Sequence, residues 1–187
     1  MFLTSKMSRF YAVMGLMAAL IQPSWAQPSP SVTGITLDES VLAALPLRSQ
    51  ATATWLFIDV YKAALYAPQT SKAQSILDDS TPLKLKLCYL HKITKDEFVE
   101  AASKALPAKL TPSLQSAVNG LHQAYRDVKP DDCYQLSYSA QQGVVLSLND
   151  VPVYQDKTPG FKALYFGIWL GKEPLSETVK ETLLEPL

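Results

Sequence analysis

The period of the hydrophobic pattern changes three times along the chain, and this order limits the folds that the chain can adopt. Apolar residues alternate with period 2 up to residue 90 and recur with period 3.6 over residues 94–125. Period 2 then returns in three short segments, and the chain ends in helical period. This order predicts an α+β fold with helices packed on one face of a mostly antiparallel sheet. The expected strands are 32–37, 45–47, 51–66, 83–90, 133–139, 144–148 and 151–154.

The helices expected between the strands have clear start and stop signals. Thr94 and Glu97 have the spacing of a capping box, and Pro107 ends the first helix. Thr111 and Pro112 open the second helix. A helical turn is expected at residues 71–77. The inner faces consist of Phe98, Ala101, Ala102 and Ala105 in the first helix and of Leu114, Val118, Leu121 and Tyr125 in the second.

The last segment, from Phe161 to Leu187, predicts two further helices. Thr158 and Pro159 supply a cap and a first-turn proline for the first of them, and Gly171 ends it. The second is expected to open near Pro174. The apolar face consists of Phe161, Leu164, Tyr165 and Ile168 in the first helix and of Leu175, Val179, Leu183 and Leu184 in the second.

The N-terminus has the pattern of a secretory signal peptide. Lys6 and Arg9 precede an apolar run at Phe10–Ile21, and small residues allow cleavage after Ala26. A membrane anchor is the alternative, but the run is shorter than the ~20 residues that a bilayer requires. We therefore expect a signal peptide at 1–26, a flexible leader at 27–31 and a single domain at 32–187, in a periplasmic protein.

The charge balance argues against a nucleic-acid partner. Removing residues 1–26 removes two basic residues and no acidic ones, which leaves 15 basic against 17 acidic residues. The remaining basic residues are scattered rather than gathered in the stripe that phosphate binding requires. No second apolar segment reaches membrane length.

Two cysteines, Cys88 and Cys133, lie on the polar faces of two expected strands. If these strands are neighbours, a cross-strand disulfide is possible in a compartment that permits disulfides. Two independent buried thiols are the alternative, and a catalytic thiol is a third. We predict the disulfide.

Few residues have the pattern of a reactive site. His91 and His122 lack metal-ligand spacing, and neither G-x-S-x-G nor a glycine-rich phosphate loop occurs. No cofactor or metal is therefore expected. Asp59 lies within an apolar strand, where it either reaches a pocket, with Lys62 or a backbone donor as partner, or sits at a solvated edge.

Four segments, taken in order, resemble the bacterial chalcone isomerase-like family. They are WLFIDVYKAALYAP at 55–68, PLKLKLCY at 82–89, the aspartate turn and strand at 127–138, and FKALYFGIWLGKEPLSETVKETLL at 161–184. The resemblance implies an open-faced β-sandwich in which helices overlie a large antiparallel sheet, with a ligand cleft between them.

The resemblance also bears on catalysis. Plant isomerases use an arginine upstream of the V-Y strand and a threonine about five residues before its tyrosine. Counting back from Tyr61 without gaps, these positions fall near Ala44 and on Leu56. Arg48 could replace the arginine and Thr52 or Thr54 the threonine only with local gaps. Related non-catalytic members bind fatty acids.

We therefore expect an exported, non-catalytic protein that binds a small apolar ligand such as a fatty acid. An isomerase or lyase acting through Arg48 is one alternative, and a module that binds another envelope protein is another. The helix aromatics, Tyr165 and Trp169 among them, are either core or the lid of a cleft. The candidate ligand-binding residues are Arg48, Trp55, Phe57, Asp59, Tyr61, Tyr165 and Trp169.

Overall fold

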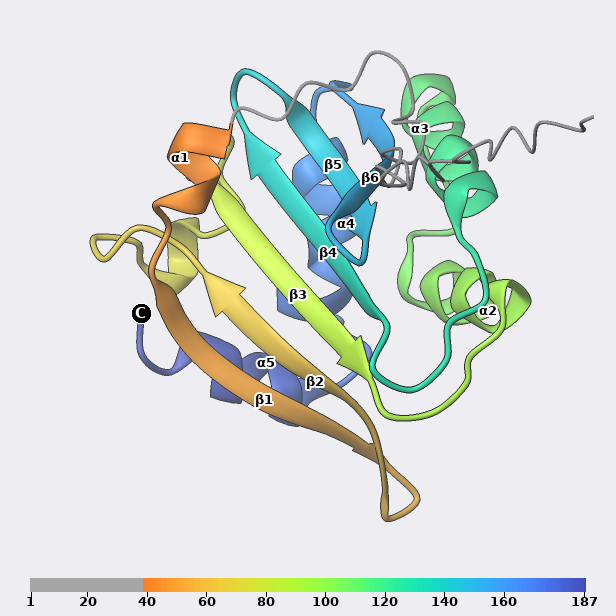
Figure 1. Cartoon of the computed structure of the whole chain (residues 1–187). Coiled ribbons are helices and arrows are strands. Elements are labelled where there is room, and N and C mark those ends of the chain that lie inside the picture. The colour runs from red at the N-terminus through yellow and green to blue at the C-terminus, as the bar shows by residue number, and fades with distance from the viewer. Residues whose placement is uncertain (1–38) are drawn as a thin grey trace, which may run out of the picture. The chain divides into compact units, whose positions relative to one another are not determined.

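A computed structural model describes residues 39–187, with side chains described from residue 41 (Figure 1). Residues 39–187 contain six strands, five α-helices and a short 3₁₀ helix. In chain order they are α1 (Glu39–Ala43), β1 (Leu47–Trp55), β2 (Ile58–Tyr66), η1 (Ala73–Ser75), β3 (Leu83–Tyr89), α2 (Lys95–Ala105), α3 (Pro112–Ala124), β4 (Cys133–Ser139), β5 (Gly143–Leu148), β6 (Val151–Asp156), α4 (Phe161–Leu170) and α5 (Glu177–Leu184). The predicted signal peptide, leader and strand 32–37 lie outside the described residues.

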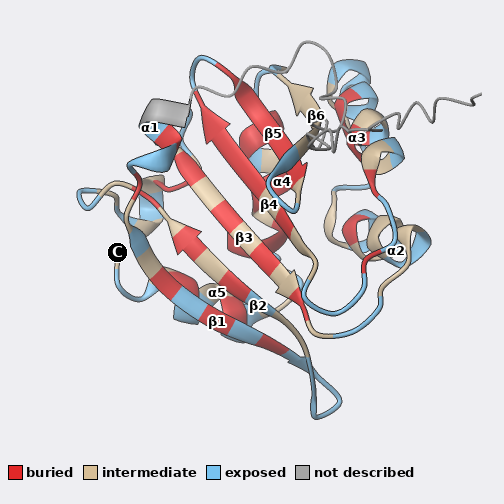
Figure 2. Cartoon of the chain, in the orientation of Figure 1, coloured by how far each residue is buried: buried red, intermediate tan, exposed pale blue. Residues whose placement is uncertain are grey.

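The six strands form one antiparallel sheet in the order β1-β2-β3-β4-β5-β6, so every neighbour in sequence is also a neighbour in space. Helices α2 and α3 are inserted between β3 and β4. Burial alternates along β3, where Leu85 and Leu87 are buried and Lys84 and Lys86 are not (Figure 2). We call the face with the buried leucines the inner face and the face with the lysines the outer face.

Helices α4 and α5 lie behind the sheet in the view of Figure 1, against its inner face. The fully buried Phe161, Tyr165 and Phe166 of α4 join the leucines of β3 in one hydrophobic core. Helix α5 packs on β1, where the Ser49 hydroxyl donates to the Leu183 carbonyl at 2.6 Å. The predicted α+β architecture, with helices over an antiparallel sheet, is therefore confirmed.

The expected single strand at 51–66 is instead a hairpin. Strand β1 ends at Trp55, Leu56 and Phe57 form the turn, and β2 begins at Ile58. Both turn residues have positive φ, 47° and 67°, although neither is Gly, Asn or Asp. The sequence carries no turn signal there, so alternation runs straight through the bend. The expected strand 45–47 is also wrong, because β1 begins only at Leu47.

The signals for α2 and α3 are confirmed. Thr94 and Glu97 form both bonds of the capping box, and the Thr111 hydroxyl accepts from the Leu114 amide. The helical turn expected at 71–77 corresponds to η1.

The C-terminal helices exist, but their predicted starts are wrong. Gly160 precedes α4 with φ +79°, a conformation that glycine adopts without strain, and the Thr158 side chain does not cap the helix. Helix α5 begins at Glu177 rather than near Pro174, because the Ser176 hydroxyl accepts from the Val179 amide.

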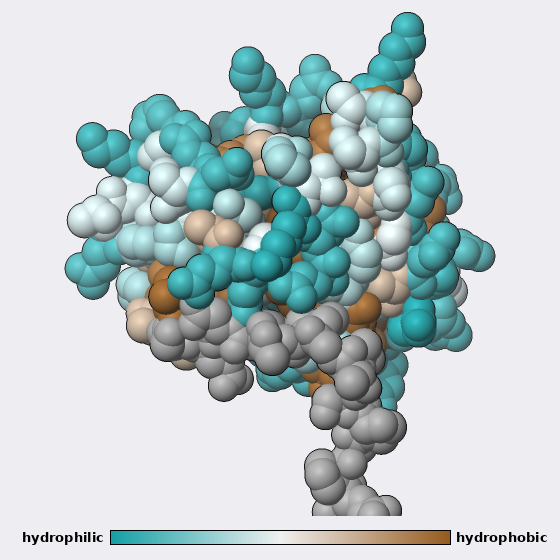
Figure 3. Space-filling view, turned by 90° about the horizontal axis from the view of Figure 1, so that it is seen from above, coloured by the Kyte–Doolittle hydropathy of each residue, from teal (hydrophilic) through white to brown (hydrophobic). Residues whose placement is uncertain are grey.

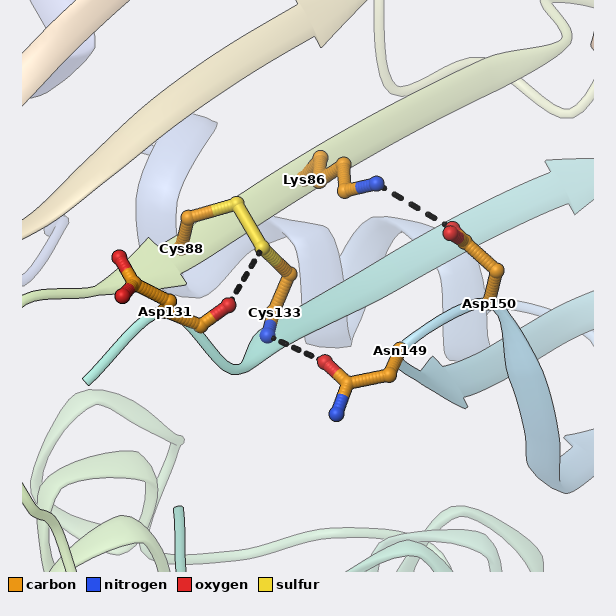
Figure 4. Close-up of polar contacts among 6 residues, drawn as sticks. All are labelled: Lys86, Cys88, Asp131, Cys133, Asn149 and Asp150. Carbon is orange, nitrogen blue, oxygen red and sulfur yellow. Dashed lines mark hydrogen bonds and ion pairs between the residues drawn. A yellow bond between two sulfur atoms is a disulfide. The ribbon is translucent and has the colours of Figure 1, made fainter. Parts of the chain in front are cut away.

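The predicted disulfide is present. Cys88 and Cys133 are direct partners in the β3–β4 register and are joined by a disulfide on the outer face (Figure 4). Asn149 at the β5–β6 turn accepts from the Cys133 amide at 2.8 Å, and Lys86 pairs with Asp150 at 3.2 Å. The β3–β4 pair is thus tied covalently at one end and bound to the next turn by polar contacts.

Candidate functional site

An apolar cavity of about 140 Å³ lies between the inner face of the sheet and helices α2 and α4. Its walls come from four elements, and the exposed Glu97 and the half-exposed Leu175 mark its open side. The main lining residues are Val60 and Tyr61 of β2, Leu87 and Tyr89 of β3, Phe98, Ala101 and Ala102 of α2, and Ile168 and Trp169 of α4.

The size of this cavity limits its contents. An apolar cavity of about 150 Å³ inside a protein holds a molecule the size of benzene. The present cavity therefore has room for one ring or for the end of an alkyl chain. A longer chain has to leave through the open side.

A cluster of buried aromatic rings supports the cavity. Phe98 stacks on Tyr125 with ring centroids 5.1 Å apart, and Tyr89 meets Phe98 edge-on at 5.1 Å. Behind them, the hydroxyls of Tyr125 and Tyr165 share a hydrogen bond of 2.9 Å. Because these rings contact one another from strand and helix alike, they hold α2 at a fixed distance from the sheet.

The buried tyrosine hydroxyls near the cavity remain neutral. Burial raises the pKa of Tyr89, Tyr125 and Tyr165 well above the ordinary value. Near neutral pH these groups therefore act as hydrogen-bonding phenols, and a phenolate base at any of them is disfavoured.

Tyr61 and Trp169 supply polar atoms in the cavity wall. The Trp169 Nε1 is buried and has no acceptor in hydrogen-bond geometry. Burial raises the pKa of the Tyr61 hydroxyl, and the Trp169 indole partly offsets this by favouring the ionised form. An indole N–H can only donate, and the nearby Tyr61 hydroxyl is its acceptor, in a contact that lies outside good hydrogen-bond geometry.

The structure brings together two of the predicted ligand-binding residues. Tyr61 and Trp169 both line the cavity, from β2 and α4. Tyr165 is fully buried beside them in the core. The sequence left open whether these helix aromatics belong to the core or to the lid of a cleft. Tyr165 lies in the core, whereas Trp169 lies in the cavity wall.

The other four predicted residues lie away from the cavity. Arg48 is half-buried and donates to the Pro68 and Pro186 carbonyls. Trp55 and Phe57 are exposed at the hairpin tip. Asp59 is exposed and accepts from the Thr54 hydroxyl at 2.6 Å, so its partner is not Lys62.

Several wall residues were recognised from the sequence only as core. Phe98 and Ala102 lie one turn apart on the apolar stripe of α2, and Leu87 and Tyr89 alternate along β3. A helical stripe predicts burial without saying whether its neighbour leaves a space. Small Ala101 and Ala102, opposite large aromatics, are the signal that could have indicated the cavity.

A wider hollow of about 720 Å³ lies on the outer face over β1, β2 and β3. Gln50, Thr52, Lys62 and Lys86 line it, and these are polar side chains at least partly open to solvent. It lacks the apolar closed wall that is typical of a small-molecule site. Among the described residues, no group of His, Cys, Asp or Glu is arranged to hold a metal ion.

The model of the chalcone isomerase-like family matches residues 30–185. The chain belongs to this family. A fatty-acid binding protein from Arabidopsis thaliana has a similar fold, with a TM-score of 0.55 and 12% identity over 75% of this chain and 84% of that one. No curated protein matches the chain in sequence. In this chain of the chalcone isomerase-like fold, the cavity lies between the sheet and the helices.

Within residues 39–187, no helix is long and apolar enough to cross a membrane.

Proposed function

We propose that the protein is an exported, non-catalytic member of the chalcone isomerase-like family that binds a small apolar ligand in the cavity between sheet and helices. One observation carries this proposal: an apolar cavity lies between sheet and helices, and its wall holds a polar pair, the Tyr61 hydroxyl and the Trp169 indole. A ligand with an apolar body and one polar oxygen would fill the space and place that oxygen beside Tyr61 and Trp169.

Fatty acids have this combination of groups, and the similar plant structure is described as a fatty-acid binding protein. The cavity volume of about 140 Å³ favours a short acyl chain or a single ring over a long chain held entirely inside. Tyr61 and Trp169 are the proposed polar contacts.

The positions of the residues needed for catalysis support a binding role. An isomerase or lyase reaction would depend on Arg48 with Thr52 or Thr54, and none of the three lines the cavity. Arg48 donates to two backbone carbonyls, and Thr54 donates to Asp59. A carbonyl substrate in the cavity would therefore find none of these groups as a donor.

Export is supported by the signal-peptide pattern at 1–26 and is compatible with the disulfide, since disulfides persist in oxidising compartments. The chain of residues 27–187 keeps the entire described core, which lies between Ala51 and Leu183. This chain is suitable for binding measurements.

The test is a calorimetric titration of residues 27–187 with hexanoate, decanoate, palmitate and benzene. Replacing Ala102 by Leu fills the cavity and is expected to weaken binding of every ligand by about tenfold or more. Trp169→Phe keeps a ring but removes the N–H. It is expected to weaken binding of the carboxylates and to leave benzene binding nearly unchanged.

Ser103→Leu is the matched control, because it adds the same side chain to the exposed side of α2. It should bind as the unmodified chain does. Absence of binding by the unmodified chain, or equal binding by the Ala102→Leu chain, would contradict the proposal. Turnover of a chalcone-like substrate that Arg48→Ala abolishes would establish the enzymatic alternative instead.

A further inference from the structure

The tip of the β1–β2 hairpin is a continuous exposed apolar segment. Trp55, Leu56 and Ile58 are 70%, 67% and 54% exposed, and Phe57 is fully exposed. Figure 1 shows this turn extending past the end of β3. The β2–β3 pairing ends at Tyr61, and the Val60 carbonyl accepts from the Leu90 amide at 2.9 Å; from Asp59 to the turn, β2 is paired with β1. Single exposed apolar residues are ordinary, but four in succession on a projecting turn indicate an interaction surface.

The turn itself is not optimised for stability. Two-residue hairpin turns with both central residues at positive φ favour Asn-Gly, and here Leu56 and Phe57 occupy these positions. Large side chains in the left-handed region are disfavoured. The tip therefore combines unfavourable backbone conformation with unfavourable exposure, which a role in binding would explain.

We propose that this tip, residues 55–58, inserts into a lipid surface. The tip projects from the sheet and all four of its residues are exposed, so it fits a fluid surface that needs no complementary groove. Trp and Phe are also suited to the boundary between headgroups and acyl chains. The hydrogen-bonded pair Thr54–Asp59 follows directly behind the tip.

The length of the tip matches this placement. One residue on each strand, Trp55 and Ile58, separates the polar pair Thr54–Asp59 from the turn, so the turn lies two residue steps, or about 7 Å, beyond the pair. Interfacial segments bury their apolar faces about 5–10 Å into the boundary region. The polar pair would then lie among the headgroups.

The charges near the tip favour a surface without net charge. Asp59 and Lys62 are the only charged residues between Thr54 and Lys62, and they balance. Binding should therefore depend on apolar insertion and vary little with salt. Figure 3 views the end of the molecule away from the tip, where the described surface is mainly hydrophilic with small separate hydrophobic areas.

The location of the tip also relates it to the cavity. Val60 and Tyr61 of β2, in the cavity wall, follow the turn residue Phe57 by three and four residues. A tip inserted in lipid would hold this end of the cavity close to the surface. The insertion itself requires no ligand, so it can be tested apart from the proposed function.

The experiment is flotation of residues 27–187 with vesicles of pure phosphatidylcholine, at low and high salt. We expect the protein to float with the vesicles under both conditions and its tryptophan emission to shift to shorter wavelength, because Trp55 enters the lipid. The double variant Leu56→Asn, Phe57→Gly supplies the favoured turn residues and removes two apolar side chains. It should fold at least as stably and bind vesicles about tenfold or more weakly.

Val151→Thr is the control, because it changes an exposed apolar residue at a different turn and should leave flotation unchanged. The proposal is overturned if the unmodified chain does not float, or if the double variant floats equally well. It is also overturned if the tip instead drives self-association, seen by sedimentation, that the double variant abolishes without any vesicle binding. Failure of ligand binding in solution would leave this result unaffected.

Discussion

Lys162 shows how a single buried charge can be accommodated in the core. It is 1% exposed at the start of α4, and its ammonium donates to the Asp78 and Thr81 carbonyls and lies 4.7 Å from the centre of the Tyr138 ring. These contacts use its donors and join α4 to the loop before β3. Burial nevertheless lowers the pKa of Lys162 to about 8, and the nearby Asp79 and Asp78 only partly offset this.

This lowered pKa predicts a pH dependence of stability. Between about pH 8 and the ordinary lysine value of about 10.4, the unfolded chain binds more protons at this site than the folded protein does. The contribution of Lys162 to the free energy of unfolding therefore rises with pH in this window. Above about pH 10 the buried tyrosines, whose pKa values are raised, act in the opposite direction.

The measurement is urea unfolding of the unmodified chain and of Lys162→Met at several pH values from about 7 to 10. The difference in stability should shift in favour of the unmodified chain as the pH rises. Lys109→Met, which removes a lysine from an exposed site, is the control. If the difference in stability between the unmodified chain and Lys162→Met does not change with pH, the lowered pKa of Lys162 is contradicted.

At the scale of the element, the β3–β4 pair and the helices between its strands form one unit. The disulfide joins Cys88 to Cys133 across a sequence separation of 45 residues, and this loop contains α2 and α3. Helix α2 supplies Phe98 and Ala102 to the cavity. The disulfide therefore closes the loop that carries one cavity wall.

Breaking this disulfide should destabilise the protein. The chain-entropy model gives about 3 to 4 kcal/mol for a loop of this length. We expect Cys88→Ser, Cys133→Ser to lower the urea midpoint accordingly. Dithiothreitol should lower the midpoint of the unmodified chain and leave that of the double variant unchanged. Equal midpoints before and after reduction would contradict this expectation.

Individual helices and turns show where the local sequence was sufficient to predict the structure and where it was not. The capping box at Thr94 and the proline at 112 define helices through contacts within one turn, so they could be predicted. The bend at Leu56-Phe57 could not, because its residues do not favour a turn. The pairing of β1 with β2 imposes it, through contacts that local preferences do not contain.

At the scale of the whole molecule, the disulfide is compatible with the export that we propose. A signal peptide at 1–26 would deliver the chain to a compartment where Cys88 and Cys133 can remain oxidised. Neither cysteine of the described chain is free. The apolar tip and the cavity would then both operate outside the cytoplasm.

We expect protein recovered from the periplasm to begin at Gln27 and to contain no free thiol. Intact mass and thiol counting under denaturing, non-reducing conditions measure both. Ala26→Asp should block cleavage and leave residues 1–26 attached. Periplasmic protein with an intact N-terminus, or with two free thiols, would contradict this prediction.

Some features of this protein were determined by its sequence alone. Alternation and caps predict the α+β class and the inner faces of helices and strands, because each depends on periodicity or on short-range bonds. Alternation also places Cys88 and Cys133 on the polar faces of their strands, but the pairing of β3 with β4 decided that they form a disulfide. Tyr61 and Trp169 were candidates because large aromatics between a sheet and its helices can line an apolar pocket, and both lie in the cavity wall. The tertiary structure decided which aromatics meet, that Ala101 and Ala102 leave a space beneath α2, and that Trp55 and Phe57 lie outside. Cavities and projecting tips depend on contacts between segments distant in sequence, and such contacts have no local signal.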